Sequence, residues 1–441
     1  MAVALQRSWK EEHWRQALAR AAPRCRGRQR RAAAFASAQR AFLPREVFIA
    51  GTARIPIGAF CGALSTLPAT RLGAEAVAAA LRRARVQPEE VDAVVLGQAL
   101  PGGCGQNAVR QAALLAEIPP AVDCIGVNKA CASGLKAITL AAQAVALGHA
   151  DVVVAGGMES MSRAPYLLRQ ARTGGYHYGH GALEDSALHD GLWDATHGCH
   201  LGSCVEKTAR DMGISRFEQD SFSVESYRRA ADAWQRGAMD AEVAPVRVQN
   251  PGLRDSMEPK MLAVSTDEEY SRLKIDTVGT LPPIFEEEGS ITAASASSLN
   301  DGASALVLVS GERARALGLG VVARVLAFAD HGVEPADFAT APSGAVRRAL
   351  QAARMARVDF HEVHEAFAAV TLANMRLLNL DASRVNVNGG GVALGHPLGA
   401  SGARIVGALI SVLQQQNAET GCASIANGGG GASAIIIERV L

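Results

Sequence analysis

The fold and the candidate site both start from one stretch, residues 122–147, which reads VDCIGVNKACASGLKAITLAAQAVAL. Val122 to Val127 predicts a short buried strand and Leu135 to Leu147 an Ala-rich helix, so Cys131 lies on a strand-to-helix turn. Unpaired backbone N–H groups at a helix start favour a thiolate there, and small residues after the cysteine permit a nucleophile elbow. Cysteine is also common as a buried structural residue, so the turn alone leaves both interpretations open.

Strand and helix patterns alternate along the chain from Glu46, which predicts α/β layers. The same order of patterns appears twice, once before residue 160 and once after residue 320. Strands are expected at 47–51, 91–96, 151–155 (ending at Gly156-Gly157), 324–329, from 358, 423–426 and 432–437, and helices at 72–84, 216–236, 345–357 and 403–413.

Two landmarks recur at almost the same offset. Val91-Asp92 returns 267 positions later as Val358-Asp359, and Ala132-Ser133-Gly134 returns 268 positions later as Ala400-Ser401-Gly402. A constant offset with a shared element order indicates an internal duplication, interrupted by an insertion rich in charge, Gly and His. The expected units are an N-terminal domain over 46–161 and 292–316, an inserted loop domain over 162–291, and a C-terminal domain over 317–441.

The composition argues against several classes of function. The 441 residues are 49% hydrophobic and 20% charged, with a net charge of +1, which gives no support for a nucleic-acid or membrane partner. None of the eight cysteines has C-x-x-C spacing, so a zinc or other divalent metal site is not expected. In a chain with a large core, reduced thiols are the better expectation than disulfides.

The first 45 residues differ from the rest. They are rich in Ala and Arg, and their only acids are Glu11 and Glu12. This pattern predicts a mitochondrial transit peptide, and hence a location in the matrix, with a disordered basic tail as the alternative.

A second candidate site lies in the second half. Loops at the carboxyl ends of strands in facing α/β halves meet, so the loop 392–402 is expected to approach Cys131. His396 in this loop can then take the Cys131 proton, and His364, at another strand end, can donate to an oxyanion. A structural histidine is the alternative for each. The run Gly428–Gly431 predicts a tight turn whose amides approach a ligand, and no Lys-Ser/Thr follows it, which excludes a Walker A loop.

Five motifs together resemble the thiolase family over about residues 46–441, most closely its mitochondrial acetoacetyl-CoA thiolase (acetyl-CoA acetyltransferase) branch. The resemblance implies two βαβαβαββ halves, a loop domain over the site, and homodimers or homotetramers. The motifs are CASGLKAI at 131–138, GGMESMS at 156–162, HEAF at 364–367, GHPLGASG at 395–402 and NGGGGAS at 427–433, and the branch is suggested by AFAD at 327–330 with VEP at 333–335.

The same resemblance implies reversible acyl transfer to and from coenzyme A. Cys131 would carry the acetyl thioester, His396 would activate it, and the backbone amides of Cys131 and Gly428 would form an oxyanion hole. Coenzyme A contacts would come from Tyr227, Arg272, Leu273, Lys274 and Ser297, with His200 on the pantetheine side. A potassium ion would be held by Tyr227 and by main-chain carbonyls of Ala293, Ala294, Ala296 and Val392.

Three positions depart from the family pattern. Ala426 stands where a second, acid/base cysteine is expected, and Cys422 lies about 13 Å away along the same strand. His364 replaces the usual Asn, as in trifunctional-enzyme thiolases, and could serve as a substitute base. Thr277 replaces a phosphate-binding Lys, while Lys274 replaces an Asp nearby.

These departures leave two functional hypotheses. In the first, acyl transfer onto Cys131 survives while condensation and thiolysis are slowed, because Ala426 cannot move a proton. In the second, the chain is a non-catalytic homologue that binds acyl-CoA or acts as a partner subunit. A ketoacyl synthase is disfavoured because the four-glycine context fits thiolases better.

Overall fold

The computed structural model describes residues 43–249 and 261–440. Apart from Leu43, Pro44 and Arg45, the predicted transit peptide lies outside the described residues. The strands of the core form one ten-stranded sheet whose two halves are joined by a short pairing of β1 with β13.

The first half of the sheet has the order β1-β12-β5-β3-β4. The contacts of β1 with β12 and β12 with β5 are antiparallel, and those of β5 with β3 and β3 with β4 are parallel. β5 and β12 are buried along their whole length, as expected for strands covered by helices on both faces. The bounds are β1 Val47–Arg54, β3 Ala93–Gly97, β4 Asp123–Val127, β5 Val152–Ser160 and β12 Asn300–Ser310, with β2 Gly58–Ala59 paired to β12.

The second half repeats this arrangement as β13-β16-β15-β14. Its first two contacts are again antiparallel and its third is parallel. A parallel bridge from His361 to Val385 takes the place that β4 has in the first half. The bounds are β13 Ala323–Gly332, β14 Phe360–Val363, β15 Thr420–Asn427 and β16 Gly431–Arg439.

Two equivalent carboxylates confirm the predicted duplication. Asp92 accepts hydrogen bonds from the two backbone N–H groups at the start of β5, at 2.8 and 2.9 Å. Asp359 accepts those at the start of β15, at 3.2 and 2.9 Å. The recurrence of Val-Asp in the sequence therefore marks the same structural position in each half.

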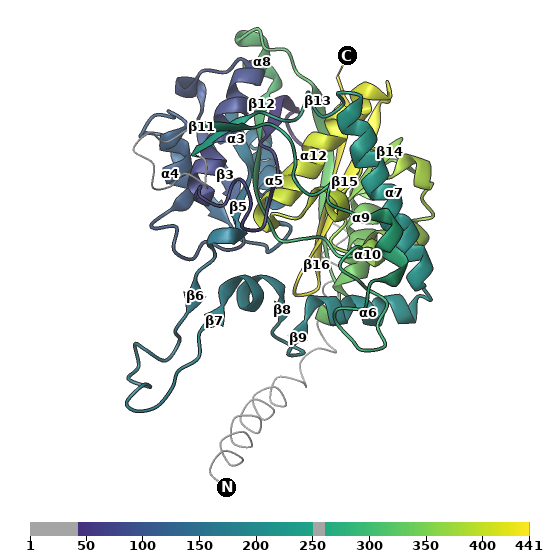
Figure 1. Cartoon of the computed structure of the whole chain (residues 1–441). Coiled ribbons are helices and arrows are strands. Elements are labelled where there is room, and N and C mark those ends of the chain that lie inside the picture. The colour runs from purple at the N-terminus through teal and green to yellow at the C-terminus, as the bar shows by residue number, and fades with distance from the viewer. Residues whose placement is uncertain (1–42, 250–260, 441) are drawn as a thin grey trace, which may run out of the picture. The chain divides into compact units, whose positions relative to one another are not determined.

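Helices cover both faces of each half, which gives five layers (Figure 1). The helices α5 and α12 pack together between the two halves and share one hydrophobic cluster with strands from both. Helices α3 and α4 cover the outer face of the first half, and α9 and α10 lie outside the second. The bounds are α3 Ala69–Ala84, α4 Ala108–Leu115, α5 Ser133–Ala146, α8 Gly311–Ala316, α9 Ala341–Ala353, α10 Ala368–Leu378, α11 Gly391–Leu394 and α12 Leu398–Gln415.

The central helices approach each other most closely at two glycines. A Cβ atom on Gly134 of α5 would lie 2.9 Å from the backbone nitrogen of Ala403 in α12. A Cβ atom on Gly402 would lie 2.4 Å from the backbone nitrogen of Leu135. Only glycine permits this approach, which brings the first turns of both helices, and the loops before them, side by side.

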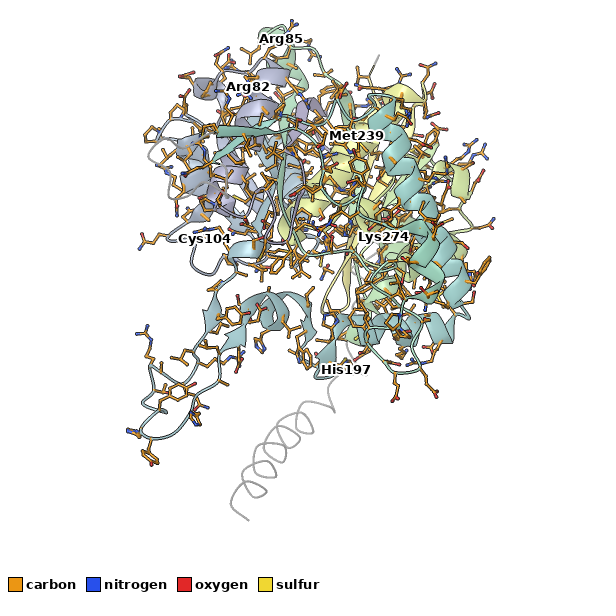
Figure 2. The ribbon with its side chains drawn as sticks, in the orientation of Figure 1. Arg82, Arg85, Cys104, His197, Met239 and Lys274 are labelled. Carbon is orange, nitrogen blue, oxygen red and sulfur yellow. The ribbon has the colours of Figure 1, made fainter. Side chains whose placement is uncertain are left out.

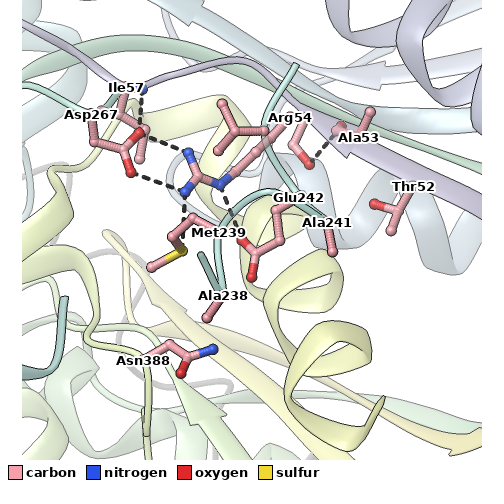
Figure 3. A network of polar contacts seen from close by, with 12 residues as sticks. Thr52, Ala53, Arg54, Ile57, Ala238, Met239, Ala241, Glu242, Asp267 and Asn388 are labelled. Carbon is pink, nitrogen blue, oxygen red and sulfur yellow. Dashed lines mark hydrogen bonds and ion pairs between the residues drawn. The ribbon is translucent and has the colours of Figure 1, made fainter. Parts of the chain in front are cut away.

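The segment between β5 and β12 is fastened to the core by buried ion pairs (Figure 3). The Arg54 guanidinium, at the end of β1, contacts the Asp267 carboxylate at 2.7 and 2.9 Å and Glu242 at 3.1 Å. The Ile57 N–H also donates to Asp267, at 2.7 Å. Removing one partner of such a pair would leave a buried charge uncompensated, so these contacts hold the segment firmly.

The boundaries predicted for the inserted domain stay a prediction. The elements are β6 Tyr166–Leu167, β7 Glu184–Asp185, β8 Trp193–Asp194, β9 Cys199–His200, α6 Leu201–Asp211, α7 Arg216–Gln235, β10 Val246–Gln249 and β11 Met261–Val264.

The expectation of a buried strand over 122–127 is wrong in its burial. β4 is the last strand of the sheet, and Ile125 at its middle is 50% exposed. The apolar pattern correctly predicted a strand, but no further strand among the described residues pairs with β4 at this edge of the sheet.

The expectation that the strand from Asp151 ends at Gly156-Gly157 is also wrong, because β5 continues to Ser160. A Cβ atom on Gly157 would lie 2.0 Å from the Gly399 carbonyl oxygen of α12. The glycines are therefore a contact surface for neighbouring backbone, and they do not end the strand.

The described ranges contain no helix long and apolar enough to cross a membrane. All seven cysteines within them are free, and Cys25 lies outside. In the same part of the chain, no three His, Cys, Asp or Glu side chains are grouped so that they could hold a metal ion.

Candidate active site

Cys131 lies buried on a tight turn between β4 and α5. The preceding residue, Ala130, has φ 45°, a left-handed conformation that costs a non-glycine residue roughly 1–2 kcal/mol. Ser133 holds this turn, since its hydroxyl accepts the Lys129 N–H at 2.8 Å and donates to the Ala130 carbonyl at 2.5 Å. Asn128 Oδ1 accepts the Ala130 N–H at 3.0 Å. The strained turn is therefore fixed by side chains from both sides.

His396 reaches the same place from the loop before α12. Its backbone N–H donates to Asn300 Oδ1 at 2.9 Å, and its Nδ1 lies 2.6 Å from Ser401 Oγ. The Ser401 hydroxyl is also 3.0 Å from the Pro397 carbonyl, which can only accept. We therefore assign the hydroxyl hydrogen to Pro397 and the ring hydrogen to Nδ1. Nε2 then keeps its lone pair and has no hydrogen-bond partner among the described residues, which suits a general base.

Cys131 and His396 line one cavity of about 240 Å³. The remaining wall is mostly apolar, so a substrate there is shielded from water and polar contacts are strengthened. The other lining residues are Met161, Leu192, His200, Leu201, Ile284, Phe285, Ala296, Ser297, Ser298, Leu299, Phe338, Ala366, Phe367, Leu398 and Ala426.

The expectation of a resting thiolate is wrong. Burial raises the pKa of the Cys131 thiol to about 11, although the backbone N–H groups of Gly428 and of Cys131 itself lower it. Burial also lowers the pKa of His396 to about 3, and the Arg404 guanidinium adds to that shift. At neutral pH the site therefore holds a neutral thiol and a neutral imidazole. The proton has to move during the attack.

His364 is not on the cavity wall. It packs against His396 with the ring centroids 4.1 Å apart. Burial, followed by the neighbouring His396 and Arg404, holds the pKa of His364 well below its ordinary value. Neither ring nitrogen has a partner in the described part of the chain. His364 is therefore a neutral proton acceptor that packs against His396.

Ala426 lines the same cavity as the thiol and contributes only a methyl group to its wall. Cys422, four residues earlier on β15, is buried in a different cluster that faces α9. Its thiol therefore does not replace the missing one, as the strand spacing predicted.

Family comparisons agree with this geometry. The Thiolase, N-terminal domain matches residues 47–312 and the Thiolase, C-terminal domain matches residues 319–439.

The chain belongs to the thiolase family.

Among its relatives, acetyl-CoA acetyltransferase 2 of Arabidopsis thaliana is 48% identical over 398 residues, covering 90% of this chain and 97% of the relative. The mitochondrial acetyl-CoA acetyltransferase of Homo sapiens is 47% identical over 399 residues, covering 90% and 91%. Among solved structures, the Acat5 thiolase from Ascaris suum in complex with coenzyme A has a TM-score of 0.84 at 41% identity, covering 90% of this chain and 100% of that one. The Bacillus anthracis acetyl-CoA acetyltransferase has a TM-score of 0.86 at 37% identity, covering 90% and 99%.

The expected coenzyme A residues of this thiolase fall into two groups. His200 and Ser297 line the cavity, and the His200 ring stacks on Phe285 with the centroids 4.7 Å apart. The others, Tyr227, Arg272, Leu273 and Lys274, are not on the cavity wall, and Arg272 and Lys274 are exposed on a loop before residue 275 (Lys274 is labelled in Figure 2). Of the expected coenzyme A residues, two therefore line the cavity and four lie away from its wall.

Two of the expected potassium ligands, Tyr227 and Val392, lie near the buried carboxylate of Glu365. The Val392 N–H donates to Glu365 Oε2 at 3.1 Å, and the pKa of Tyr227 is raised to about 12 by burial, then by Glu269 and Glu365. The carbonyls of Ala293, Ala294, Ala296 and Val392 accept no hydrogen bond from the described residues. Free carbonyls and a phenol beside a carboxylate fit a large monovalent cation.

Reasoning from the sequence missed three residues that shape this thiolase site. Ser133 and Ser401 fix the cysteine turn and the histidine ring, and both lie in the repeated Ala-Ser-Gly landmarks, so the duplication was the available signal. Glu159, inside a family motif, was given no role. Its signal was a lone acid in an otherwise apolar strand.

Proposed function

We propose that this thiolase is an acetyl-CoA acetyltransferase that carries the acyl group as a thioester on Cys131. The observation that carries the proposal is the shared cavity in which Cys131 and the free Nε2 of His396 lie together. The relatives named above, which are acetyl-CoA acetyltransferases, support the same activity.

Acylation follows from the geometry in two steps. His396 Nε2 takes the Cys131 proton as the sulfur attacks the thioester carbonyl carbon, and the N–H groups of Cys131 and Gly428 stabilise the oxyanion. When the intermediate collapses, the bond from the carbonyl carbon to the coenzyme A sulfur breaks. His396 then returns the proton to that sulfur. The products are acetyl-Cys131 and free coenzyme A.

Coenzyme A is the proposed acyl carrier. The solved complex of the Ascaris suum thiolase with coenzyme A supports this choice. We place the pantetheine arm beside His200 and Ser297, and the phosphates near the exposed cations Arg272 and Lys274. Tyr227 and Leu273 complete the proposed contacts.

The second half of the reaction is the weak point. Condensation needs a base that removes a proton from the second acetyl group, and the methyl side chain of Ala426 cannot accept a proton. General acid–base groups contribute about 10²–10⁴-fold to such steps. We therefore propose that condensation and thiolysis are slowed by about that factor, while acylation of Cys131 is retained.

Mass spectrometry tests the first half directly. After incubation with acetyl-CoA, the peptide containing Cys131 is expected to gain one acetyl group, and the Cys131→Ser variant serves as the control. Absence of the adduct on the wild-type chain would reject acyl transfer.

A second candidate function is favoured by Ala426 itself: a non-catalytic homologue that binds acyl-CoA. A coupled acetoacetyl-CoA thiolysis assay separates the two. Sustained turnover by the wild-type chain supports the enzyme, whereas coenzyme A binding with neither turnover nor adduct supports the binding protein.

Potassium is proposed as a structural ligand of Tyr227, Ala293, Ala294, Ala296 and Val392. When bound, the ion would supply positive charge beside Glu365 and order the turn that leads to Ser297. The expected result is a higher melting temperature in potassium than in sodium at equal ionic strength. Tyr227→Phe is expected to remove that difference, and equal melting temperatures for the wild type would reject the site.

Assembly and location complete the proposal. We propose a homodimer or homotetramer, because β4 is an open sheet edge and Ile125, Leu114 and Leu115 expose apolar surface beside it. The oligomeric state is measured by light scattering.

The mitochondrial relatives support a mitochondrial location, and the matrix is the proposed compartment. A fusion of residues 1–45 to a fluorescent protein tests it.

A further inference from the structure

The geometry points to Glu159 as a positioning residue that sets the separation between the thiol of Cys131 and the imidazole of His396. Glu159 is the next-to-last residue of β5, and its side chain is fully buried. One oxygen, Oε2, accepts hydrogen bonds from the backbone N–H groups of Ala99 and Gly399, each at 2.8 Å. These two groups belong to different halves of the molecule. The inference rests on the roles proposed above for the thiol and the imidazole.

The contact to Ala99 leads to the nucleophile. The Ala99 carbonyl accepts a hydrogen bond from Asn128 Nδ2 at 3.0 Å. Asn128 Oδ1 in turn accepts the N–H of Ala130, the strained residue before Cys131. A displacement of Ala99 is therefore passed to the cysteine turn through two hydrogen bonds.

The contact to Gly399 leads to the base. Gly399 lies in the first turn of α12, where the N-cap residue, Pro397, has no side-chain group that can cap the helix. Glu159 supplies the missing acceptor from another element, and a carboxylate at a helix N-terminus is stabilising. His396 precedes this turn, and Ser401, which holds its Nδ1, lies within it. The carboxylate therefore anchors the frame that orients the imidazole.

The negative charge of Glu159 disfavours the thiolate form of Cys131. Burial and then the Glu159 carboxylate raise the pKa of Cys131, so the charge opposes thiolate formation. Burial raises the pKa of Glu159 itself to about 7, so the comparison is made at about pH 9, where the carboxylate is ionised. If charge were its main influence, neutralising Glu159 would make Cys131 react faster. If geometry is its main influence, the same change makes Cys131 react more slowly. The sign of the effect therefore separates the two.

Glu159→Gln is the test variant, because it keeps the size of the side chain and removes one acceptor. Oε1 accepts the Leu100 N–H at 3.2 Å and Oε2 the other two, so an amide NH2 faces at least one backbone donor in either orientation. Since small misplacements of reacting groups cost up to about 100-fold, we expect Cys131 acetylation to slow by about 10–100-fold. The affinity for coenzyme A is expected to stay unchanged.

Asp92→Asn is the matched control. Asp92 ties the starts of β3 and β5 together through two backbone N–H groups, as Glu159 ties their ends. The control makes the same carboxylate-to-amide change on the same strand pair, away from the cavity. It is expected to leave the acetylation rate within about twofold of wild type, whatever it does to the melting temperature.

A double-mutant cycle with His396→Ala tests whether Glu159 acts through the base. With the imidazole absent, Glu159→Gln is expected to have little further effect on Cys131. Each variant is measured by acetylation from acetyl-CoA and by alkylation with iodoacetamide, both quantified on the Cys131 peptide. If the wild type is alkylated but never acetylated, the proposed function fails while the alkylation cycle still tests Glu159.

Three results would overturn the inference: an unchanged or faster Glu159→Gln variant, an equal loss in Asp92→Asn, or an equal loss with and without His396. If Glu159→Gln does not fold, as judged by circular dichroism, Glu159→Asp replaces it. Aspartate keeps the charge but shortens the reach, so the same slowing is expected, and a normal rate would reject the positioning role.

Discussion

The imidazole rings of His364 and His396 lie with their centroids 4.1 Å apart and their planes inclined by 52°. Of their ring nitrogens, only Nδ1 of His396 has a hydrogen-bond partner within the described ranges. Buried polar groups are usually satisfied, so unpartnered nitrogens beside a cavity mark groups that wait for a proton or a ligand. Under the proposal that Ala426 occupies the acid/base position, these rings are the candidate substitute proton acceptors: His396 lines the cavity with Cys131, and His364 packs against His396.

Ala426→Cys is expected to raise acetoacetyl-CoA thiolysis by about 10²–10⁴-fold, because it returns a thiol that can move a proton in the cavity. The rate of Cys131 acetylation should change little, since that step uses His396. The measurement is kcat in the coupled assay beside the single-turnover acetylation rate. Cys422→Ser is the control and should alter neither rate, because that thiol lies in another cluster.

His364→Asn is expected to lower the residual thiolysis of the wild-type chain by about tenfold or more. The reason is that it removes an unpartnered proton acceptor beside His396. In the Ala426→Cys background the same change should cost less, because the new thiol carries the proton. Comparing kcat in both backgrounds checks this, and equal losses would show that His364 does not cover for the missing cysteine.

Neither Cys131 nor His396 is expected to cause an inflection in the alkylation of Cys131 by iodoacetamide between about pH 5 and pH 9. The expected inflection in this window belongs to Glu159, because burial raises its pKa to about 7. Burial raises the pKa of the thiol to about 11 and lowers that of His396 to about 3, so neither group titrates in this window. In His396→Ala the rate should instead rise about tenfold per pH unit, because attack then requires a free thiolate. A wild-type inflection near the ordinary histidine value that persists in Glu159→Gln would contradict the burial argument.

Gly157→Ala is expected to lower the free energy of unfolding by about 3 kcal/mol or more, since overpacking against fixed backbone is costly. A Cβ atom there would lie 2.0 Å from the Gly399 carbonyl oxygen. Gly320 has open space around it, so Gly320→Ala should change stability by less than about 1 kcal/mol. Denaturant unfolding of both variants is the check, and similar values for the two would count against the close contact.

Glu362→Gln is expected to reduce the loss of stability between about pH 5 and pH 8. Burial raises the pKa of Glu362 from 4.5 to about 8. A carboxyl with a raised pKa binds its proton more tightly in the folded state, so its stabilising contribution is lost as the pH rises through that value. Glutamine does not titrate. Urea unfolding at both pH values measures the difference, with the exposed Glu287→Gln as control.

Much of the architecture was predictable because local pattern and global fold agree. Apolar runs and helical periodicity predicted β1, α3 and α5 to within a few residues. The repeated Ala-Ser-Gly landmark predicted that the two halves face each other, and this placed His396 near Cys131 without any distance information. α12 begins five residues before its expected start, because two of its first five residues, Gly399 and Gly402, are poor helix formers and give a weak helical signal.

What the sequence could not predict depends on burial set by distant parts of the chain. The exposure of β4 follows from the absence of a further strand beside it in the described ranges, which no local pattern records. The thiol of Cys131 stays protonated because burial outweighs the helix-start effect, and burial here comes from elements far along the chain. Glu159 acquires its contacts only when β5, the turn after β3 and α12 meet.

The contact between α5 and α12 has a further consequence. Gly134 meets Ala403 while Gly402 meets Leu135, and the duplication relates Gly134 to Gly402 and Leu135 to Ala403. Such reciprocal pairing is what an isologous interface produces, in which two identical subunits meet about a two-fold axis. The centre of this chain thus has the geometry of a fused homodimer, in which one half carries the thiol and the other the imidazole.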